Sequence, residues 1–276
     1  MTRPTAGHAS AELGVDPDGR PLDDLLEAVH AQLATRHMAH LIRFPTTTQA
    51  FVGFASEFGE PLTYYGTNGV GAHSQHPAIH QVQYDADAAA RGELHALDGP
   101  LDIHSAQSLR TPRPSFFLML MVNAGWQEDS TGCNGESVLI PWQSAWEAIK
   151  ESDSDRYRLM REALLQPIPY PDGVERSLVY RLPGATSDTD LGVRFKYDLL
   201  PHLVRTLGRD DPLVRRVEYF ADVARACALV KQLHTGDLVL LDNHRWGHGR
   251  RSVRGQRNVG DGVEVNPREL WSLTLA

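Results

Sequence analysis

Apolar residues recur with helical spacing in four regions of the chain. Over residues 22–35, leucine and valine return at intervals of three and four, which places them on one face of a helix. The threonines at 46–48 offer a cap for a second helix that we expect to end near Phe58. The same spacing predicts longer helices over 142–165 and 215–233. The helices therefore lie at the start of the chain and in its middle.

Short apolar runs between polar or Gly/Pro-containing segments predict β-strands. The run 116–123 is apolar at almost every position, which is typical of a strand buried on both faces. The other expected strands lie at residues 40–44, 79–84, 137–141, 178–181, 193–197, 238–241 and 270–275. Several short strands with helices packed outside favour a mainly β fold with a jelly-roll, or double-stranded β-helix, core. We expect one domain over 1–276, with a loose segment at 1–20.

The composition and charge of the chain limit the kinds of molecule that it is expected to bind. The chain has 276 residues, 41% of them hydrophobic, and a net charge of −8, so a single core is feasible and a nucleic-acid polymer is not an expected partner. Cys133 and Cys227 are too few for a disulfide framework, which fits a reducing cytoplasm. No apolar run is long enough to cross a membrane, and the first residues lack a signal-peptide core. We expect a cytoplasmic protein with a small-molecule substrate and no carrier-protein domain; a homo-oligomer stays open.

The segment 240–250 carries the strongest chemical signal. It places His248 at the end of an apolar strand, in a turn flanked by glycines, and His104 lies far upstream. A mononuclear non-haem iron site uses two histidines and one carboxylate and leaves three positions open for a bidentate oxo-acid and O2. We expect the two histidines at opposite ends of one barrel. Arg268 offers a planar fork that suits the far carboxylate of the oxo-acid.

Four stretches together resemble a known family, over roughly residues 40–276. They are 103–108 (IHSAQS), 135–137 (GES), 236–250 (GDLVLLDNHRWGHGR) and 267–271 (PRELW). The chain resembles the taurine-dioxygenase and clavaminate-synthase-like superfamily of Fe(II)/2-oxoglutarate enzymes. This resemblance implies that His104 and His248 are iron ligands, that Arg268 binds the distal carboxylate of 2-oxoglutarate and that Ser137 hydrogen-bonds this co-substrate.

The interval between His248 and Arg268 is longer than is usual in that family. A Gly-rich insert at 255–262 accounts for the extra residues, and Arg254 and Arg257 are the alternative anchors for 2-oxoglutarate.

Ala106 departs from the family pattern. Relatives carry Asp or Glu two residues after the first histidine, and alanine cannot ligate a metal. Members with Gly or Ala there resemble the Fe(II)/2-oxoglutarate halogenases, in which chloride takes the vacated position and a substrate radical recombines with the halide. The resemblance therefore implies iron, 2-oxoglutarate, O2 and chloride as cofactors.

Other interpretations of Ala106 stay open. Asp102 lies two residues before His104 and could share a strand face with it, so a displaced carboxylate could complete a hydroxylase or desaturase site. The chain could also be a binding protein that has lost catalysis. Asp242 and Asn243 are expected to shape the turn that aims His248.

The substrate is indicated only by scattered residues. Tyr64, Tyr65 and Asn68 lie in a Gly-rich loop that could form a lid, and Arg194 and Trp246 are further candidates. Basic residues that could clamp a phosphate or carboxylate are Arg176, Arg181, Arg194, Lys196, Arg250, Arg251, Arg254 and Arg257. A deoxynucleoside monophosphate is the first candidate substrate and a free amino acid the second.

Overall fold

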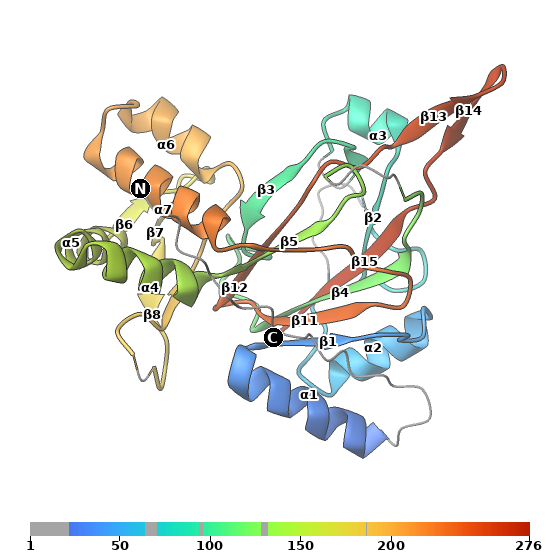
Figure 1. Cartoon of the computed structure of the whole chain (residues 1–276), viewed down its shortest axis with the longest axis horizontal. Helices are drawn as coiled ribbons and strands as arrows, with labels where there is room; N and C mark the ends of the chain where they lie inside the picture. The colour runs from blue at the N-terminus through green and yellow to red at the C-terminus, as the bar shows by residue number, and fades with distance from the viewer. Residues whose placement is uncertain (1–21, 64–70, 94–95, 128–131, 186) are drawn as a thin grey trace.

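The computed structural model describes residues 22–63, 71–93, 96–127, 132–185 and 187–276. Within these residues, two antiparallel sheets form the centre of the fold (Figure 1). The five strands of the larger sheet are β1 (Met38–Leu41), β2 (His80–Gln83), β4 (Phe116–Asn123), β11 (Leu238–Asp242) and β15 (Glu269–Leu275). The four strands of the smaller sheet are β3 (Leu101–His104), β5 (Ser137–Pro141), β10 (Leu229–Lys231) and β12 (Trp246–Arg250).

The strand order crosses the sequence repeatedly. The larger sheet runs β1-β11-β4-β15-β2 and the smaller runs β10-β5-β12-β3. Three two-stranded ribbons complete the β structure: β6 (Pro167–Pro169) with β7 (Glu175–Ser177), β8 (Val179–Arg181) with β9 (Leu191–Val193), and β13 (Gln256–Val259) with β14 (Gly262–Val265). The predicted mainly β fold with a jelly-roll core and flanking helices is confirmed.

Strand β4 shows why its sequence is apolar throughout. Side chains alternate between the two faces of a strand. Leu118 and Leu120 point outward and pack with α1 (Leu22–Arg36) and α2 (Thr48–Ser56) in one apolar cluster. Phe117, Met119 and Met121 belong to a second cluster, which also contains Leu139 and Trp246 of the smaller sheet. This second cluster lies between the sheets, so β4 is buried on both faces as predicted.

The outer face of the smaller sheet is covered by the remaining long helices (Figure 1). They are α4 (Trp142–Ser152), α5 (Ser154–Leu164), α6 (Leu199–Leu207) and α7 (Pro212–Ala226); a short α3 (Ala86–Ala90) follows β2. Trp142, Trp146 and Phe220 are fully buried where α4 and α7 meet the sheet. Within the described residues, no helix is both long and apolar enough to span a membrane.

The helices predicted over 22–35 and 48–58 are confirmed, and Thr47 caps the second through a hydrogen bond from the Ala50 amide. The prediction over 142–165 is wrong in one respect, because Asp153 ends α4 and its side chain caps α5. The helix expected over 215–233 ends at Ala226, because β10 follows and pairs with β5. A short apolar run does not separate helix from strand by periodicity alone, and here sheet pairing decides.

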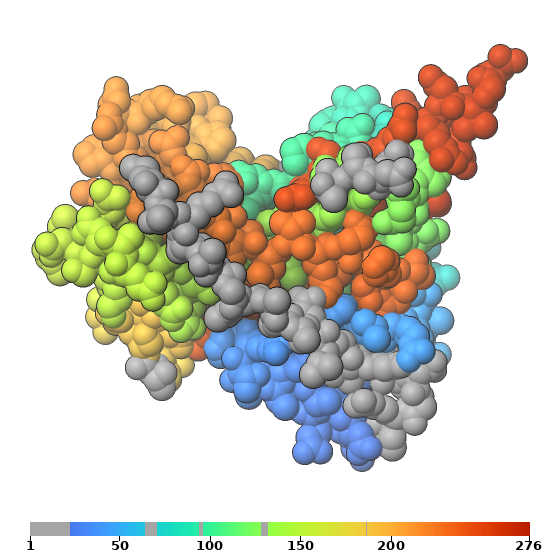
Figure 2. Space-filling model, viewed as in Figure 1, coloured from blue at the N-terminus to red at the C-terminus, as the bar shows by residue number. Residues whose placement is uncertain are grey.

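Strand positions also need correction in three places. The first strand is Met38–Leu41 rather than 40–44, and β9 is Leu191–Val193 rather than 193–197, because β9 pairs with β8 only over those three residues. His248 lies inside strand β12, not in a turn. The Gly-rich insert forms the β13–β14 hairpin, which projects from the body of the molecule (Figure 2).

Candidate metal centre

Two histidines lie side by side on the last two strands of the smaller sheet. His104 is the last residue of β3, and His248 lies in the middle of β12; the strands are antiparallel neighbours in which these two residues are register partners. Their ring centroids are 4.1 Å apart. The expectation that they sit at opposite ends of a barrel is wrong, because residues far apart in sequence are adjacent in this sheet. The pairing brings together the two residues that were predicted to act together.

Both imidazoles are held in the state that binds metals. The Nδ1 atom of His104 lies 2.9 Å from the Asp102 carbonyl oxygen, an arrangement in which Nδ1 carries the proton and Nε2 keeps its lone pair. Burial lowers the pKa of His104, and burial with the neighbouring His104 lowers the pKa of His248 well below its ordinary value. Neutral imidazole is the form that ligates a metal ion.

The surroundings of His248 fit a bound metal. The side chain is buried, its Nδ1 atom has no hydrogen-bond partner in the described structure, and the ring of Phe117 stacks on it at 4.2 Å. A buried polar atom without a partner is costly unless a ligand or ion satisfies the group nearby. Two adjacent, neutral imidazoles, of which His248 is buried and His104 half-buried, are nitrogen donors that suit Fe(II) among other transition metals.

Ala106 lies two residues after His104 and is 5% exposed. It belongs to the apolar cluster between the sheets, with Met119 and Trp246. Across the described residues, no group of three His, Cys, Asp or Glu side chains is arranged to hold a metal. The centre described here therefore presents two histidines and a methyl group where a facial triad would place its carboxylate.

Asp102 does not supply a third ligand in this structure. Its carboxylate accepts hydrogen bonds from Arg225 of α7 at 2.8 and 3.1 Å, at the edge strand of the smaller sheet. Asp102 and His104 alternate with Ile103 along β3, but the pairing with Arg225 keeps this carboxylate out of any three-residue metal group with the histidines in the described residues. Arg225 holds the carboxylate, while the Asp102 carbonyl orients the imidazole.

Asn243 fixes the backbone at Ala106. Its side-chain oxygen accepts from the Ala106 amide at 2.9 Å, and its side-chain nitrogen donates to the carbonyls of Ala106 and Pro114, each at 3.0 Å. The buried Arg113 in turn donates to the Asn243 carbonyl at 2.7 Å. The expected turn-shaping role is therefore right for Asp242, which accepts from the amides of the next residues, but wrong for Asn243.

Replacing Asn243 with alanine should destabilise the fold. The change leaves one buried amide and two buried carbonyls without their partner, which costs about 2–4 kcal/mol in free energy of unfolding. Urea denaturation of the variant measures the loss, with Asn258→Ala on the exposed β13–β14 hairpin as the control. A loss no larger than that of the control would mean that the hydrogen bonds to Ala106 do not hold this segment.

Arg268 lies just before β15 and is 4% exposed. Its guanidinium donates to the Gly135 carbonyl at 3.0 Å, and burial lowers the pKa of Arg268 to about 10, so it remains a cation at neutral pH. Gly135 has a φ of +65°, and a Cβ there would lie 2.8 Å from the Arg268 Nε. Only glycine leaves room for the guanidinium in this position.

The alternative anchors lie on the surface. Arg257 forms an ion pair with Glu264 within the projecting hairpin and lies over the Trp126 ring, and Arg254 is exposed. Ser137 is buried on β5, where it is the register partner of the buried Arg250 on β12. The sequence named Arg250 only as part of a basic cluster. Its position two residues after His248 was the signal that could have singled it out.

The predicted substrate residues are only partly brought together. Trp246 is buried in the cluster with Ala106, and its indole donates to the Arg36 carbonyl at 3.0 Å. Arg194 donates to the Ser108 carbonyl at 3.0 Å. The candidates Tyr64, Tyr65 and Asn68 lie outside the described residues.

The basic residues do not converge into one clamp, because Arg176 pairs with Asp172 and Lys196 with Asp198. The sequence missed Tyr197, whose ring lies 6.2 Å from His104 with the Lys196 ammonium over it at 4.3 Å. The expected strand over 193–197 hid this residue, since the chain leaves the ribbon at Val193.

Solved structures with this fold are numerous. A mutant of the non-haem iron oxygenase OrfP bound to (3S)-hydroxy-L-Arg is 15% identical, with a TM-score of 0.64 over 93% of this chain and 80% of that one. A taurine dioxygenase from Burkholderia xenovorans is 17% identical, with a TM-score of 0.60 over 93% and 83%. Asparagine oxygenase is 17% identical, with a TM-score of 0.59 over 92% and 78%. At these identities the likeness shows the fold.

No curated protein sequence matches the chain significantly. The family model described as "Taurine catabolism dioxygenase TauD, TfdA family" matches residues 2–263, which is most of the sequence. The match includes the stretches that contain His104, Ala106 and His248. The chain therefore belongs to the TauD/TfdA family of iron- and 2-oxoglutarate-dependent dioxygenases, which are oxidoreductases.

Proposed function

We propose that this protein is an Fe(II)/2-oxoglutarate-dependent halogenase that acts on an unactivated carbon of a free small molecule. One observation carries the proposal: Ala106, two residues after His104, is buried in the apolar cluster that contains Phe117, the residue whose ring stacks on His248. Two neutral histidines leave an iron(II) centre with one more positive charge than a facial triad does. A halide ion in the place of the missing carboxylate would restore that charge balance.

The residues divide the work of the site. His104 and His248 would hold the iron, and their shared register fixes the angle between the two imidazoles. Bound iron, with 2-oxoglutarate and O2, would supply the oxidant that removes a hydrogen atom from the substrate. Phe117, Ala106 and Trp246 surround the centre with apolar surface, which excludes water from it. Exclusion of water would protect a reactive oxidant and a substrate radical from side reactions.

Arg268 and Ser137 are proposed to hold 2-oxoglutarate. Arg268 is a buried cation that uses one N–H on the Gly135 carbonyl and has a planar fork for a carboxylate. Arg250 adds a second buried cation beside Ser137, and its charge helps to lower the pKa of Arg268. Binding of the dianionic 2-oxoglutarate near Arg268 and Arg250 would relieve the repulsion between these two cations.

Replacing Arg268 with glutamine should weaken 2-oxoglutarate binding strongly. Loss of a charge-assisted bidentate contact costs about 2–3 kcal/mol, so the KM for 2-oxoglutarate should rise about 30–150-fold. Initial rates of succinate formation measure the effect, and Arg257→Gln on the projecting hairpin serves as the matched control. Equal KM values for the two variants would remove Arg268 from the co-substrate site.

The structure favours a free amino acid over a nucleoside monophosphate as the proposed substrate. Support for a nucleoside monophosphate came from a basic clamp that does not form, because members such as Arg176 and Arg194 bind other partners. Near His104, by contrast, Lys196 and Asp198 form an ion pair at 2.5 Å next to Tyr197. A cation and an anion side by side complement the carboxylate and ammonium groups of a free amino acid. We propose a free amino acid as the substrate, with a nucleotide as the alternative.

A hydroxylase of the same substrate class is the alternative function. Asparagine oxygenase, a fold relative, is described in complex with Fe(II), 3-hydroxyasparagine and succinate, so the fold accommodates amino-acid hydroxylation. Product analysis separates the two. The protein is incubated with Fe(II), 2-oxoglutarate, O2 and each free amino acid, with and without chloride, and products are analysed by mass spectrometry.

A product with the chlorine isotope pattern that forms only with chloride is the expected result. Hydroxylated product formed at the same rate with and without chloride would establish the hydroxylase instead. If neither product appears and 2-oxoglutarate binding is independent of iron, the chain is a binding protein.

A further inference from the structure

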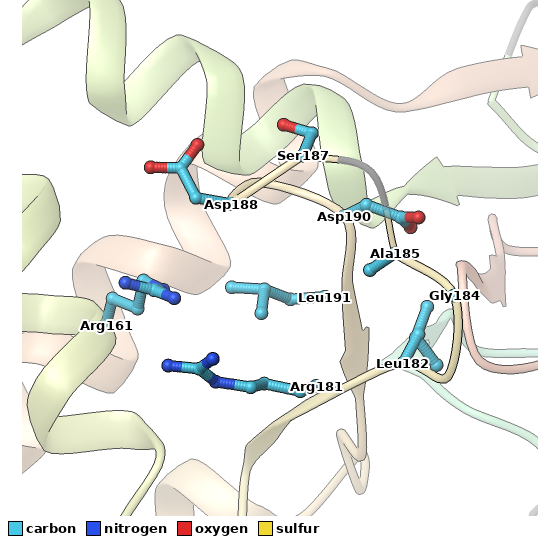
Figure 3. A pocket seen from close by; sticks show the side chains of 9 residues that line it. All are labelled: Arg161, Arg181, Leu182, Gly184, Ala185, Ser187, Asp188, Asp190 and Leu191. Atoms are coloured by element: carbon cyan, nitrogen blue, oxygen red, sulfur yellow. The ribbon is translucent and has the colours of Figure 1, made fainter.

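A second pocket lies at the loop end of the β8–β9 ribbon, and it shares no lining residue with the metal centre. Its volume is about 410 Å³. Arg161 of α5 and Arg181 of β8 form one side (Figure 3). The other side is lined by Leu182, Gly184, Ala185, Ser187, Asp188, Asp190 and Leu191. These two arginines have no part in the proposed binding of the metal or of 2-oxoglutarate.

The two carboxylates at this pocket are already paired with cations outside it. Asp188 lies 2.7 Å from the Lys150 ammonium, which holds the pKa of that carboxyl below its ordinary value. Asp190 accepts both hydrogen bonds of a bidentate pair from Arg245, each at 2.9 Å. Neither carboxylate forms an ion pair with Arg161 or Arg181 in the described residues, although the charge of Arg161 also helps to lower the pKa of Asp188.

The two arginines have no such partners. In the described residues, no ion pair joins Arg161 or Arg181 to a carboxylate, and the Nε of Arg161 is buried without a hydrogen-bond partner. Figure 3 shows both guanidinium groups on the same side of the pocket, one from the helix and one from the strand. Two like charges on one side of a pocket repel each other when neither has an ion-pair partner, so an anion between them is favoured.

We infer that this pocket binds a phosphate group, either free phosphate or the phosphate of a small metabolite. Two guanidinium forks from different elements offer more N–H donors than one planar carboxylate can accept, whereas a tetrahedral phosphate presents three oxygens to both forks. The Nε of Arg161 gains the partner it lacks. This inference does not depend on the proposed halogenation, since none of its residues belongs to the metal centre.

Calorimetric titration with inorganic phosphate tests the inference. The full chain is first saturated anaerobically with Fe(II) and 2-oxoglutarate, so that the arginine proposed for the co-substrate is occupied. Arg161→Gln and Arg181→Gln should each weaken phosphate binding at least about tenfold, which is the effect of losing about 1.4 kcal/mol. The double variant should lose measurable binding.

Arg158→Gln is the matched control. It lies on the same helix, pairs with Glu162 and does not line the pocket, so phosphate affinity should stay unchanged. Tighter binding of a phosphate monoester than of inorganic phosphate would assign the site to a phosphorylated metabolite, and equal binding would assign it to free phosphate. Absence of phosphate binding, binding unchanged in the double variant, or acetate binding as tightly as phosphate would overturn the inference.

Discussion

Replacing Ala106 with aspartate is expected to abolish halogenation and to leave a hydroxylating enzyme. The new carboxylate would stand two residues after His104, beside the paired imidazoles, and would complete a two-histidine, one-carboxylate site. Asn243 holds the backbone of this residue through two hydrogen bonds, so the carboxylate enters at a fixed place. The position would then carry a protein negative charge and would exclude the halide by occupancy and by repulsion.

The measurement is the ratio of chlorinated to hydroxylated product at saturating chloride. Halogenation should fall by more than about 100-fold, because the halide competes with a carboxylate tethered at the iron. Ala106→Gly keeps the position free of a ligand and should continue to halogenate. An Ala106→Asp variant that halogenates as well as the parent would show that the halide does not bind at residue 106.

Replacing His248 with alanine should eliminate tight iron binding and turnover together. His248 is one of only two candidate protein ligands in the described part of the chain. Loss of an outer-shell partner alone costs 10–100-fold in metal affinity, so loss of a ligand should cost more than about 100-fold. Anaerobic Fe(II) titration gives the affinity, and 2-oxoglutarate consumption gives the turnover.

The matched control for this variant is His30→Ala. His30 is an exposed histidine on α1 that contacts Phe58 and lies outside the candidate centre. It should bind iron as the parent does, which separates a specific ligand from adventitious binding by surface histidines. If His248→Ala also retains parental iron affinity, the pair His104 and His248 is not the metal centre.

Much of the fold was predictable because burial imposes simple periodicities. The strand 116–123 was predicted at its observed bounds, since both of its faces meet apolar clusters. Strand β12 was not predicted, because its sequence, WGHGR, contains two glycines and two charged or polar residues. Its extended form is set by pairing with β3 and β5 on either side, which no local pattern encodes.

In the candidate site, too, local motifs were predictable from the sequence and contacts between distant segments were not. His104, His248 and Arg268 were identifiable from local motifs, although the neighbouring positions of the histidines emerged only from strand pairing. The roles of Asn243 and Tyr197 depend on contacts across large sequence separations, such as the hydrogen bonds between Asn243 and Ala106. The basic cluster was misleading, because its members are dispersed over the fold and three of them, Arg176, Lys196 and Arg257, pair with local carboxylates.

The central claim is that two histidines hold an iron with a halide position at Ala106. An anaerobic absorbance titration tests it most directly: apoprotein receives Fe(II), then 2-oxoglutarate, then chloride, while the charge-transfer band of the chelated co-substrate is followed. The account predicts a band that appears with 2-oxoglutarate and shifts or tightens with chloride, and that ignores chloride in Ala106→Asp. A band in the parent protein that does not respond to chloride would contradict the account and would point to an oxygenase whose third ligand lies elsewhere.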